Sequence, residues 1–422
     1  MTKNRYEAAR AALEPSVLLE QLRDMGDIGL TRPGDRDSGR TRMALDDGDR
    51  DGRDRLTAWM RELDLDVRVD GIGNIFGLLP GAADLPPLMM GSHIDTVAQA
   101  GPLDGVYGVL SGLAVVRAFR KAGVVPPRPL AVAAFTNEEG VRFQPDMLGS
   151  LVHVGGLSLD AALNARGIDG ARLGDELVRI GYAGSAPTGA LRPAAYLELH
   201  VEQGPVLEAE GFQIGVVEGV QGISWRRISV EGQSNHAGTT PTRLRRDAGL
   251  TAARIVTRLR EMTETGETVA TVGRLHLEPD LVNVIPARAT LTVDMRDPDE
   301  QRLRAAEDAL DAYLLAVAAQ DGVRVSSERL ARFEPVPFDP ALVNVVEDTA
   351  RRLGYSCRRM VSGAGHDAQM MARICPTAMI FTPSKGGLSH CPQECTDPED
   401  LSRGVAVLME TVLARLAGDE AR

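Results

Sequence analysis

Residues 88–122 read LMMGSHIDTVAQAGPLDGVYGVLSGLAVVRAFRKA, and this stretch indicates the fold class of the chain. The apolar residues 88–90 are typical of a buried strand that leads into a loop at Gly91, Ser92 and His93. Residues 105–122 predict a helix, and Gly123 follows as its C-cap residue. A buried strand that leads into a helix is the repeating unit of an α/β domain.

Three further apolar runs predict buried strands, and polar residues follow each of them. Residues 129–135 (PLAVAAF) end at a polar loop that contains Glu138 and Glu139. Residues 194–199 (AAYLEL) end at His200, and residues 378–382 (AMIFT) lead through a glycine-rich loop to His390. In open α/β sheets, ligands bind at the carboxyl ends of the strands. We therefore expect these polar side chains to collect at one edge of the sheet.

The middle of the chain has a different pattern. Residues 223–231 (ISWRRISVE) and 289–295 (ATLTVDM) alternate apolar and polar residues, as half-solvated strands do. Thr240 and Pro241 predict the start of a helix that runs to about Glu261, and residues 299–319 predict a second helix. This order of elements predicts a small α+β domain over residues 223–335. The catalytic domain is then discontinuous and comprises residues 1–222 and 336–422.

Length, charge and cysteine content narrow the class of protein. A chain of 422 residues exceeds the size at which one core usually keeps growing, so two domains are expected. The net charge of −12 argues against a nucleic-acid partner. No apolar run approaches the roughly 18 residues that span a bilayer, and no secretion signal is recognisable, so we expect no membrane partner. The four cysteines are expected to be free thiols of a cytoplasmic protein.

Five residues from these clusters suit two divalent metal ions. The imidazoles of His93, His200 and His390 and the carboxylates of Asp104 and Glu139 are ligands that zinc, manganese, cobalt and nickel accept. A carboxylate has two oxygens and can bridge the two ions of a hydrolase. Taken singly, each residue has a simpler interpretation, because a lone histidine is more often structural and Asp104 could cap the following helix.

Residues next to the candidate ligands suit supporting roles. Glu138 stands beside a ligand and is a natural general base and later general acid. Asp95 suits the role of fixing the tautomer of a nearby imidazole. The alternative for Glu138 and Glu139 is an exposed loop pair. Cys391 is a conceivable ligand, although the chain contains no Cys-x-x-Cys spacing, and His153 is expected to be structural.

Seven longer motifs extend this pattern: GSHIDTVAQAGPLDGVYGVLSGL, FTNEEGVRFQPDMLGS, ELHVEQGPVLE, GQSNHAGTTPTRLRRDAG, VNVIPARATLTVDMRDPD, SGAGHDAQMMA and PTAMIFTPSKGGLSHCPQE. They resemble the hydantoinase/carbamoylase family, which includes N-carbamoyl-L-amino-acid hydrolases, allantoate amidohydrolases and β-alanine synthases. The resemblance runs from Gly73 to Glu394. It implies a metallopeptidase-like α/β catalytic domain with a central mixed sheet and two metal ions. It also implies an inserted α+β domain that closes over the site and forms a homodimer.

The resemblance gives individual residues their roles. The expected metal ligands are His93, Asp104 as the bridge, Glu139, His200 and His390, and the expected catalytic residues are Glu138, His236 and Asp95. The residues expected around the substrate are Gln203, Asn283, Arg296, Gly365 and His366. The guanidinium of Arg296 can hold a substrate carboxylate bidentately, and Gly365 allows close approach of the backbone. His236 can donate to a developing oxyanion, and the resemblance implies that it reaches the partner subunit's site.

The resemblance leaves several functions open. The first is hydrolysis of an N-carbamoyl-L-amino acid to the amino acid, carbon dioxide and ammonia, with allantoate and β-ureidopropionate as rival substrates. The second is an N-acyl-amino-acid deacylase or aminopeptidase. His200, followed by Val-Glu-Gln, argues against the second, because related peptidases commonly have a carboxylate at this position. The third is an inactive protein with the same fold, and the presence of Glu138 and all the ligands argues against it.

Overall fold

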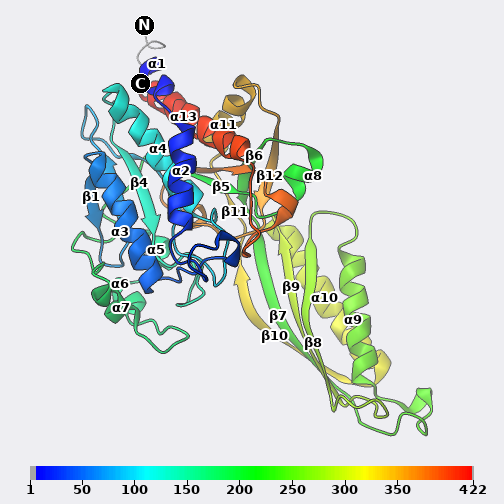
Figure 1. Ribbon diagram of the computed structural model, residues 1–422. Coiled ribbons are helices and arrows are strands. Elements are labelled where there is room, and N and C mark those ends of the chain that lie inside the picture. The colour runs from blue at the N-terminus through cyan, green and yellow to red at the C-terminus, as the bar shows by residue number, and fades with distance from the viewer. Residues whose placement is uncertain (1–5, 421–422) are drawn as a thin grey trace. The chain divides into compact units, whose positions relative to one another are not determined.

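The computed structural model describes residues 6–420, and the chain forms two compact units. Unit 1 comprises Met1–Gly219 and Pro337–Arg422, and unit 2 is the inserted segment Val220–Val336. The described residues form two separate sheets, which can be followed in Figure 1. The predicted α/β class, with a mixed central sheet and a smaller α+β part, is confirmed.

The larger sheet has nine strands within residues 6–420, in the order β1-β2-β4-β3-β5-β13-β6-β11, with β12 paired to β6. Its strands are β1 (Asp66–Val69), β2 (Ile75–Leu79), β3 (Leu88–His93), β4 (Leu130–Phe135), β5 (Ala195–Val201), β6 (Ile214–Val220), β11 (Val336–Pro337), β12 (Cys357–Ser362) and β13 (Thr377–Thr382). The sheet is mixed, because β2 runs antiparallel to β1 and β4 while the strands at its centre are parallel.

Four neighbouring strands of this sheet run in the same direction. β3 pairs in parallel with β4 and with β5, and β13 pairs in parallel with β5. All four are buried along their whole length, which explains their almost continuous apolar sequences. Their carboxyl ends therefore meet at one edge of the sheet, as the sequence predicts. His93 is the last residue of β3, and His200 is the last but one of β5.

Helices cover both faces of the larger sheet. The helices of unit 1 are α1 (Glu7–Ala11), α2 (Pro15–Gly26), α3 (Asp47–Glu62), α4 (Val106–Ala122), α5 (Leu148–His153), α6 (Leu159–Leu163), α7 (Leu173–Arg179), α8 (Val206–Glu210), α11 (Pro340–Arg352), α12 (Asp367–Met371) and α13 (Pro398–Glu420). On β5, Leu199 lies against Gly404 of α13, whereas Glu198 accepts a hydrogen bond of 2.8 Å from the main-chain N–H of Ala368 in α12. Neighbouring strand residues point to opposite faces, so α12 and α13 lie on opposite faces.

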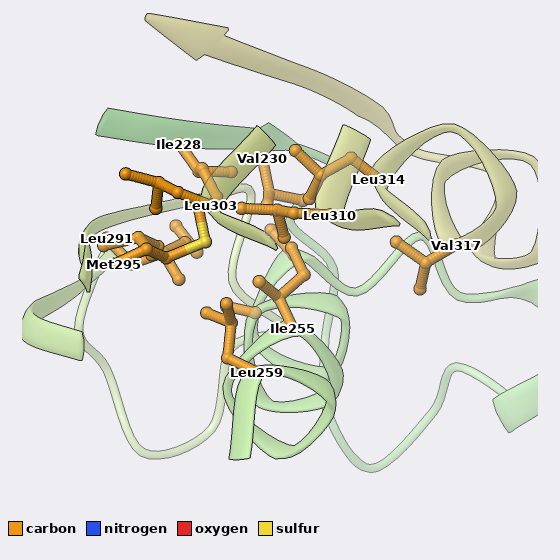
Figure 2. Close-up of a cluster of buried hydrophobic side chains, with 14 residues drawn as sticks. Ile228, Val230, Ile255, Leu259, Leu291, Met295, Leu303, Leu310, Leu314 and Val317 are labelled. Atoms are coloured by element: carbon orange, nitrogen blue, oxygen red, sulfur yellow. The ribbon is translucent and has the colours of Figure 1, made fainter. Parts of the chain in front are cut away.

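Unit 2 has a four-stranded antiparallel sheet in the order β10-β7-β9-β8. Its strands are β7 (Gly222–Glu231), β8 (Val269–Glu278), β9 (Arg288–Asp297) and β10 (Arg324–Phe333), and its helices are α9 (Ala248–Met262) and α10 (Glu300–Asp321). Alternate residues of β7 and β9 are buried, and in β9 they are mainly the apolar ones, as the sequence pattern predicts. In the first half of β7 the polar Ser224 and Arg226 are buried instead, and Trp225 is exposed. Figure 2 shows side chains from the sheet and both helices gathered in one core, among them Val230, Ile255 and Leu310. The two helices therefore cover one face of this sheet.

The predicted start of the first helix in unit 2 is wrong. The chain after Pro241 forms only a short 3₁₀ turn, Thr242–Leu244, because Pro241 has an extended conformation with φ −58° and ψ 141°. The helix α9 begins at Ala248, where the carboxylate of Asp247 accepts hydrogen bonds from the main-chain N–H groups of Gly249 and Leu250. An aspartate at the N-cap satisfies donors that proline does not, so Asp247 sets the start of the helix.

Within residues 6–420, the structure contains no helix that is both long enough and apolar enough to cross a membrane.

His153 has a structural environment, as the sequence predicts. Its ring packs against the rings of Phe76 and Phe135, with centroid separations of 5.3 and 5.8 Å. Its Nε2 lies 3.1 Å from the main-chain oxygen of Leu191, which can only accept, so Nε2 carries the proton. Burial lowers the pKa of His153 to about 4, and the ring is therefore uncharged at neutral pH.

We expect His153 to make the protein less stable as the pH falls from about 6.5 towards 4. The unfolded imidazole has a pKa near 6.5, so over this range the unfolded state takes up a proton before the folded state does. The expected loss at pH 4.5 is about 2–3 kcal/mol of unfolding free energy. Urea titrations at pH 7 and pH 4.5 on the wild type and on His153→Phe measure it.

The variant also loses the hydrogen bond to Leu191, but it does so at every pH. The comparison therefore uses the change with pH, which we expect to be smaller in the variant. Equal pH dependence in the two proteins would show that His153 is not the group responsible.

Candidate metal centre

Six polar side chains meet at the carboxyl edge of the parallel strands. They are His93 in β3, Asp104 in the turn before α4, Glu138 and Glu139 in the loop after β4, His200 in β5 and His390 in the loop after β13. Five of these side chains are at least nine-tenths buried, and that of His390 is 51% exposed. The cluster thus lies within the protein and is open to solvent on the His390 side.

The carboxylate of Asp104 belongs to two groups of possible ligands. Its Oδ1 lies 3.2 Å from Nε2 of His200 and 3.6 Å from Nε2 of His93. Its Oδ2 lies 3.1 Å from Nε2 of His390, which is 3.5 Å from Oε2 of Glu139. Within each group the possible ligand atoms all lie within 4.8 Å of one another. One carboxylate shared by two such groups is the arrangement in which two ions are bridged.

Main-chain carbonyl groups fix the tautomers of the two buried imidazoles. Nδ1 of His93 lies 2.9 Å from the main-chain oxygen of Asp95, and Nδ1 of His200 lies 2.9 Å from that of Val201. A carbonyl oxygen can only accept a hydrogen bond, so both Nδ1 atoms carry a proton. Both Nε2 atoms then carry a lone pair and face Asp104, and that of His200 also accepts a hydrogen bond of 3.2 Å from the main-chain N–H of Gly105. This is the tautomer that a metal ligand needs.

Asp95 supports the loop that carries the two glutamates. Its carboxylate accepts hydrogen bonds from the main-chain N–H groups of Glu138 and Glu139, at 3.3 and 3.4 Å. The same carboxylate is 3.9 Å from Nδ1 of His93, which is farther away than the main-chain oxygen of Asp95. Asp95 therefore contacts His93 through its main chain and the glutamate loop through its side chain.

Burial and like charges raise the pKa values of both glutamates. Burial, with the charge of Asp104, raises the pKa of Glu139 to about 8. Burial also raises the pKa of Glu138 well above its ordinary value, and the carboxylates of Asp367, Glu139 and Asp104 add to this effect. A cation placed among these carboxylates would stabilise their charged forms and so lower both pKa values. The donor set of imidazole nitrogens and carboxylate oxygens therefore fits divalent ions.

A cavity of about 130 Å³ opens onto this cluster. Besides Asp104, Glu138, Glu139 and His390, its lining residues are Asp146, Gln203, Ala364, Gly365 and His366. Gln203 donates a hydrogen bond of 2.8 Å from Nε2 to Oδ2 of Asp104. The His366 ring is 4.7 Å from that of His200, and its Nε2 is 2.8 Å from Oγ of Ser362. The structure thus brings three of the predicted substrate residues together with the predicted ligands.

The predicted catalytic residue His236 and the predicted substrate residues Asn283 and Arg296 belong to unit 2. Nδ1 of His236 accepts hydrogen bonds from the main-chain N–H groups of Gly238 and Thr239, at 3.0 and 3.3 Å. Its proton is therefore on Nε2, in an exposed ring that can donate. The main-chain oxygen of Asn283 accepts a hydrogen bond of 3.0 Å from Ala237, so Asn283 lies beside the same loop.

Arg296 lies on β9, on the face of the sheet that the helices leave open. Its side chain is partly exposed, whereas its neighbours Met295 and Asp297 are buried. The guanidinium pairs with the carboxylate of Asp294 at 2.8 Å, two residues earlier on the same face. This pairing fixes the plane of the guanidinium.

Two simpler interpretations of the acidic residues do not hold. Asp104 does not cap α4, because the N-cap residue is Gly105 and no side chain bonds to the first turn. Glu138 and Glu139 form no exposed pair, because both side chains are buried. Among residues 6–420, no group of possible metal ligands includes Cys391, which is partly buried.

Sequence reasoning missed three side chains at this edge, namely Asp146, Ser389 and Glu394. Asp146 lines the cavity, and Ser389 donates a hydrogen bond of 2.9 Å to Oε2 of Glu394. All three lie within motifs that already contain a candidate ligand or catalytic residue. Their proximity to those motifs is the only signal in the sequence, because a lone carboxylate or hydroxyl in a loop has no characteristic spacing.

Comparison with known proteins shows which family the chain belongs to. Residues 89–414 match the profile described as peptidase family M20/M25/M40. The chain is 41% identical over 399 residues to the N-carbamoyl-L-amino-acid amidohydrolase of Rhizobium meliloti, with 94% of this chain and 95% of the relative covered. It is 35% identical over 386 residues to the allantoate amidohydrolase of Bacillus subtilis, with 90% and 93% covered.

A solved structure has the same fold over almost the whole chain. It is a hydantoinase/carbamoylase family amidase from Burkholderia multivorans, with a TM-score of 0.92 and 41% sequence identity. The alignment covers 96% of this chain and 98% of that one.

The substitution Gly105→Ala should disturb the cluster through His93. Gly105 has φ 66° and ψ −49°, and a Cβ atom at this position would lie 2.4 Å from Nε2 of His93. Strain at this conformation and displacement of the ring should together cost about 2–4 kcal/mol of unfolding free energy. Urea titration of the metal-free protein measures this loss.

Gly123→Ala is the matched control. Gly123 has φ 63°, and a Cβ atom there would have no neighbour within 4 Å. Its substitution should cost only the left-handed conformation, about 1–2 kcal/mol. Equal losses in the two variants would contradict a role for the contact with His93.

Proposed function

Because the chain belongs to peptidase family M20/M25/M40, and within it to the hydantoinase/carbamoylase amidases, we propose that it hydrolyses the carbamoyl C–N bond of an N-carbamoyl-L-amino acid. The products are the amino acid, carbon dioxide and ammonia. One observation carries the proposal: two groups of possible ligands share Asp104, and Glu138 stands beside them with its carboxylate in the cavity. The relative from Rhizobium meliloti is named for this reaction.

The proposed cofactor is a pair of divalent ions. His93, Asp104 and His200 would hold one ion, and Asp104, Glu139 and His390 the other. Zinc, manganese, cobalt and nickel all suit this set of ligands. When bound, the ions would polarise the ureido carbonyl and lower the pKa of a water molecule.

Glu138 is the proposed general base and general acid. Its side chain is 9% exposed and lines the cavity, with Oε2 3.4 Å from Nε2 of His93. A carboxylate in this position takes the proton of the attacking water and returns it to the departing nitrogen of the amino acid. Because burial raises its pKa, Glu138 holds the proton more firmly than an exposed glutamate would between these two steps. Asp95 positions the loop of Glu138 through the main-chain N–H groups.

The remaining predicted residues are proposed to bind the substrate. Gln203, Gly365 and His366 line the cavity next to the ligands. Arg296 presents a planar guanidinium, which matches a carboxylate through two parallel hydrogen bonds. His236 carries a proton on its exposed Nε2 and would donate to the oxyanion, and Asn283 lies beside its loop.

Two rival substrates carry the same ureido group. Allantoate is one candidate, because the relative from Bacillus subtilis is named for its hydrolysis. β-Ureidopropionate is another, because it also combines a ureido group with a carboxylate. An N-acyl-amino-acid deacylase or aminopeptidase remains the second candidate. His200 disfavours that candidate, because related peptidases commonly have a carboxylate at this position.

We further propose that the protein forms a homodimer through unit 2. Several large apolar side chains of this unit are exposed, among them Trp225, Leu275, Val282 and Leu315. Contact between two copies would remove such surface from water. Light scattering of the purified protein would then give twice the mass of one chain.

The cytoplasm is the proposed compartment. The four cysteines, Cys357, Cys375, Cys391 and Cys395, are all free thiols. Free thiols are typical of a reducing compartment, because oxidising compartments favour disulfides.

Release of ammonia from a small panel of substrates tests the proposed reaction. The panel comprises N-carbamoyl-L-methionine, its D-enantiomer, β-ureidopropionate, allantoate and N-acetyl-L-methionine, each with metal-reconstituted and chelator-treated protein. We expect metal-dependent ammonia from N-carbamoyl-L-methionine and no free methionine from the N-acetyl compound. Methionine from the N-acetyl compound alone would instead establish a deacylase.

The substitution Glu138→Gln should lower kcat by a factor of about 10²–10⁴, because an amide cannot carry the proton. The variant keeps the size of the side chain and removes no metal ligand. We therefore expect its bound metal, measured by elemental analysis, and its urea midpoint to equal those of the wild type. Near-normal turnover would remove Glu138 from the mechanism.

The substitution Arg296→Ala should raise KM for N-carbamoyl-L-methionine at least tenfold, because a charge-assisted bidentate pair is worth about 1.5–3 kcal/mol. Arg227→Ala is the matched control, since Arg227 lies on the same face of the sheet and pairs with Glu328 at 2.7 Å. Its KM should be unchanged. Equal effects of the two substitutions would show that loss of positive charge, rather than the position of Arg296, affects binding.

A further inference from the structure

Glu394 is a buried carboxylate that the proposed reaction does not use. It is 4% exposed, and no lysine or arginine within residues 6–420 forms an ion pair with it. A buried carboxylate without a cation is costly unless hydrogen bonds satisfy its oxygens. The donors that surround Glu394 therefore explain how the charge is tolerated.

Glu394 accepts three hydrogen bonds, two from a distant turn and one from within its own loop. Its Oε1 accepts from the main-chain N–H groups of Leu103 and Asp104, at 2.7 and 3.2 Å. Its Oε2 accepts from the hydroxyl of Ser389 at 2.9 Å. The turn carries Asp104 and the loop of Glu394 carries His390, so Glu394 links the loop of one proposed metal ligand to the turn of another.

The turn before Asp104 approaches Glu394 unusually closely. A Cβ atom at Gly101 would lie 2.2 Å from Cβ and 2.5 Å from Oε1 of Glu394. Only a residue without a side chain fits there. The turn and the carboxylate are therefore packed against each other without spare room.

The hydroxyl of Ser389 has two possible acceptors. Oε2 of Glu394 is 2.9 Å away, and Oδ2 of Asp104 is 3.4 Å away. The hydroxyl has one proton, so it can donate to only one of them at a time. The shorter distance favours Glu394.

This choice decides how many lone pairs Asp104 keeps. Its Oδ2 already accepts a hydrogen bond of 2.8 Å from Gln203. A carboxylate oxygen has two lone pairs, so one remains for an ion beside His390 and Glu139. A second hydrogen bond, from Ser389, would occupy it.

We propose that Glu394 is a positioning residue of the metal centre: it holds the turn that carries Asp104 and accepts the hydrogen bond of the Ser389 hydroxyl, so that Oδ2 of Asp104 keeps a lone pair for metal. This inference rests on the proposed two-ion site. Hydrogen bonds behind a ligand commonly set metal affinity, and their loss costs about 10–100-fold in affinity.

The substitution Glu394→Gln tests the proposal at constant volume. The two main-chain N–H groups require the amide oxygen of glutamine, so the amide NH₂ faces Ser389. The Ser389 oxygen then accepts a hydrogen bond from this amide, and its hydroxyl donates to Oδ2 of Asp104 instead. We expect the affinity for the more weakly held of two zinc ions to fall 10–100-fold, measured by equilibrium dialysis and elemental analysis.

A second substitution separates this mechanism from a general structural effect. In the double variant Glu394→Gln/Ser389→Ala no hydroxyl competes for Asp104, so the zinc affinity should return to within about threefold of the wild type. Rescue of this kind is not expected from a residue that only stabilises the fold. Glu399→Gln, on the exposed side of α13, is the matched control and should bind zinc as the wild type does.

The outcomes are distinct. Wild-type affinity in Glu394→Gln, or a loss that Ser389→Ala does not restore, would overturn the proposal. If Glu394→Gln lowers the urea midpoint of the metal-free protein, the zinc affinity of the single variant Ser389→Ala serves as the test instead. Zinc affinity within about threefold of the wild type supports the proposal, and a tenfold loss overturns it. A wild-type protein that binds no divalent ion would instead refute the proposed function, and this inference with it.

Discussion

The two oxygens of a single carboxylate, that of Asp104, constrain the whole centre. One oxygen faces His93 and His200, and the other faces His390. Both groups must therefore reach the same small turn before α4. The larger sheet meets this requirement by placing β3 next to β5, which brings the rings of His93 and His200 to a centroid distance of 6.3 Å. The left-handed backbone of Gly105 then lets the turn pass directly over His93.

Most of the fold could be predicted, because its determinants are local. The buried strands β3, β4, β5 and β13 show as short apolar runs, and α4 shows as a helix closed by a glycine. The start of α9 could not be read correctly, because two cap signals compete within eight residues. Thr240 with Pro241 and Asp247 both suit an N-cap, and only the folded chain shows that Asp247 bonds to the first turn. Local propensity cannot rank two sites that are both locally acceptable.

The site could be predicted only in part, for a similar reason. Its candidate metal ligands, apart from Asp104, lie at or after the ends of recognisable strands, so the strand pattern and the motifs lead to them. Glu394 acts through contacts with a turn almost three hundred residues earlier in the chain, and Ser389 acts through Glu394. No periodicity or spacing encodes such a contact. The predicted roles of Arg296 and His236 rest mainly on the resemblance to the family. The structure of unit 2 gives only the local contacts of these two side chains.

The discontinuity of unit 1 has a consequence for biosynthesis. Unit 2, at Val220–Val336, leaves the ribosome before β13 and the loop of His390 have been made. Its own sheet and core are then complete, whereas the larger sheet still lacks the strand between β5 and β6. The nascent chain can therefore fold its inserted part first and must finish its outer part last. A truncated product that ends before residue 390 has four of the five candidate ligands, and its second group, which needs His390, stays incomplete.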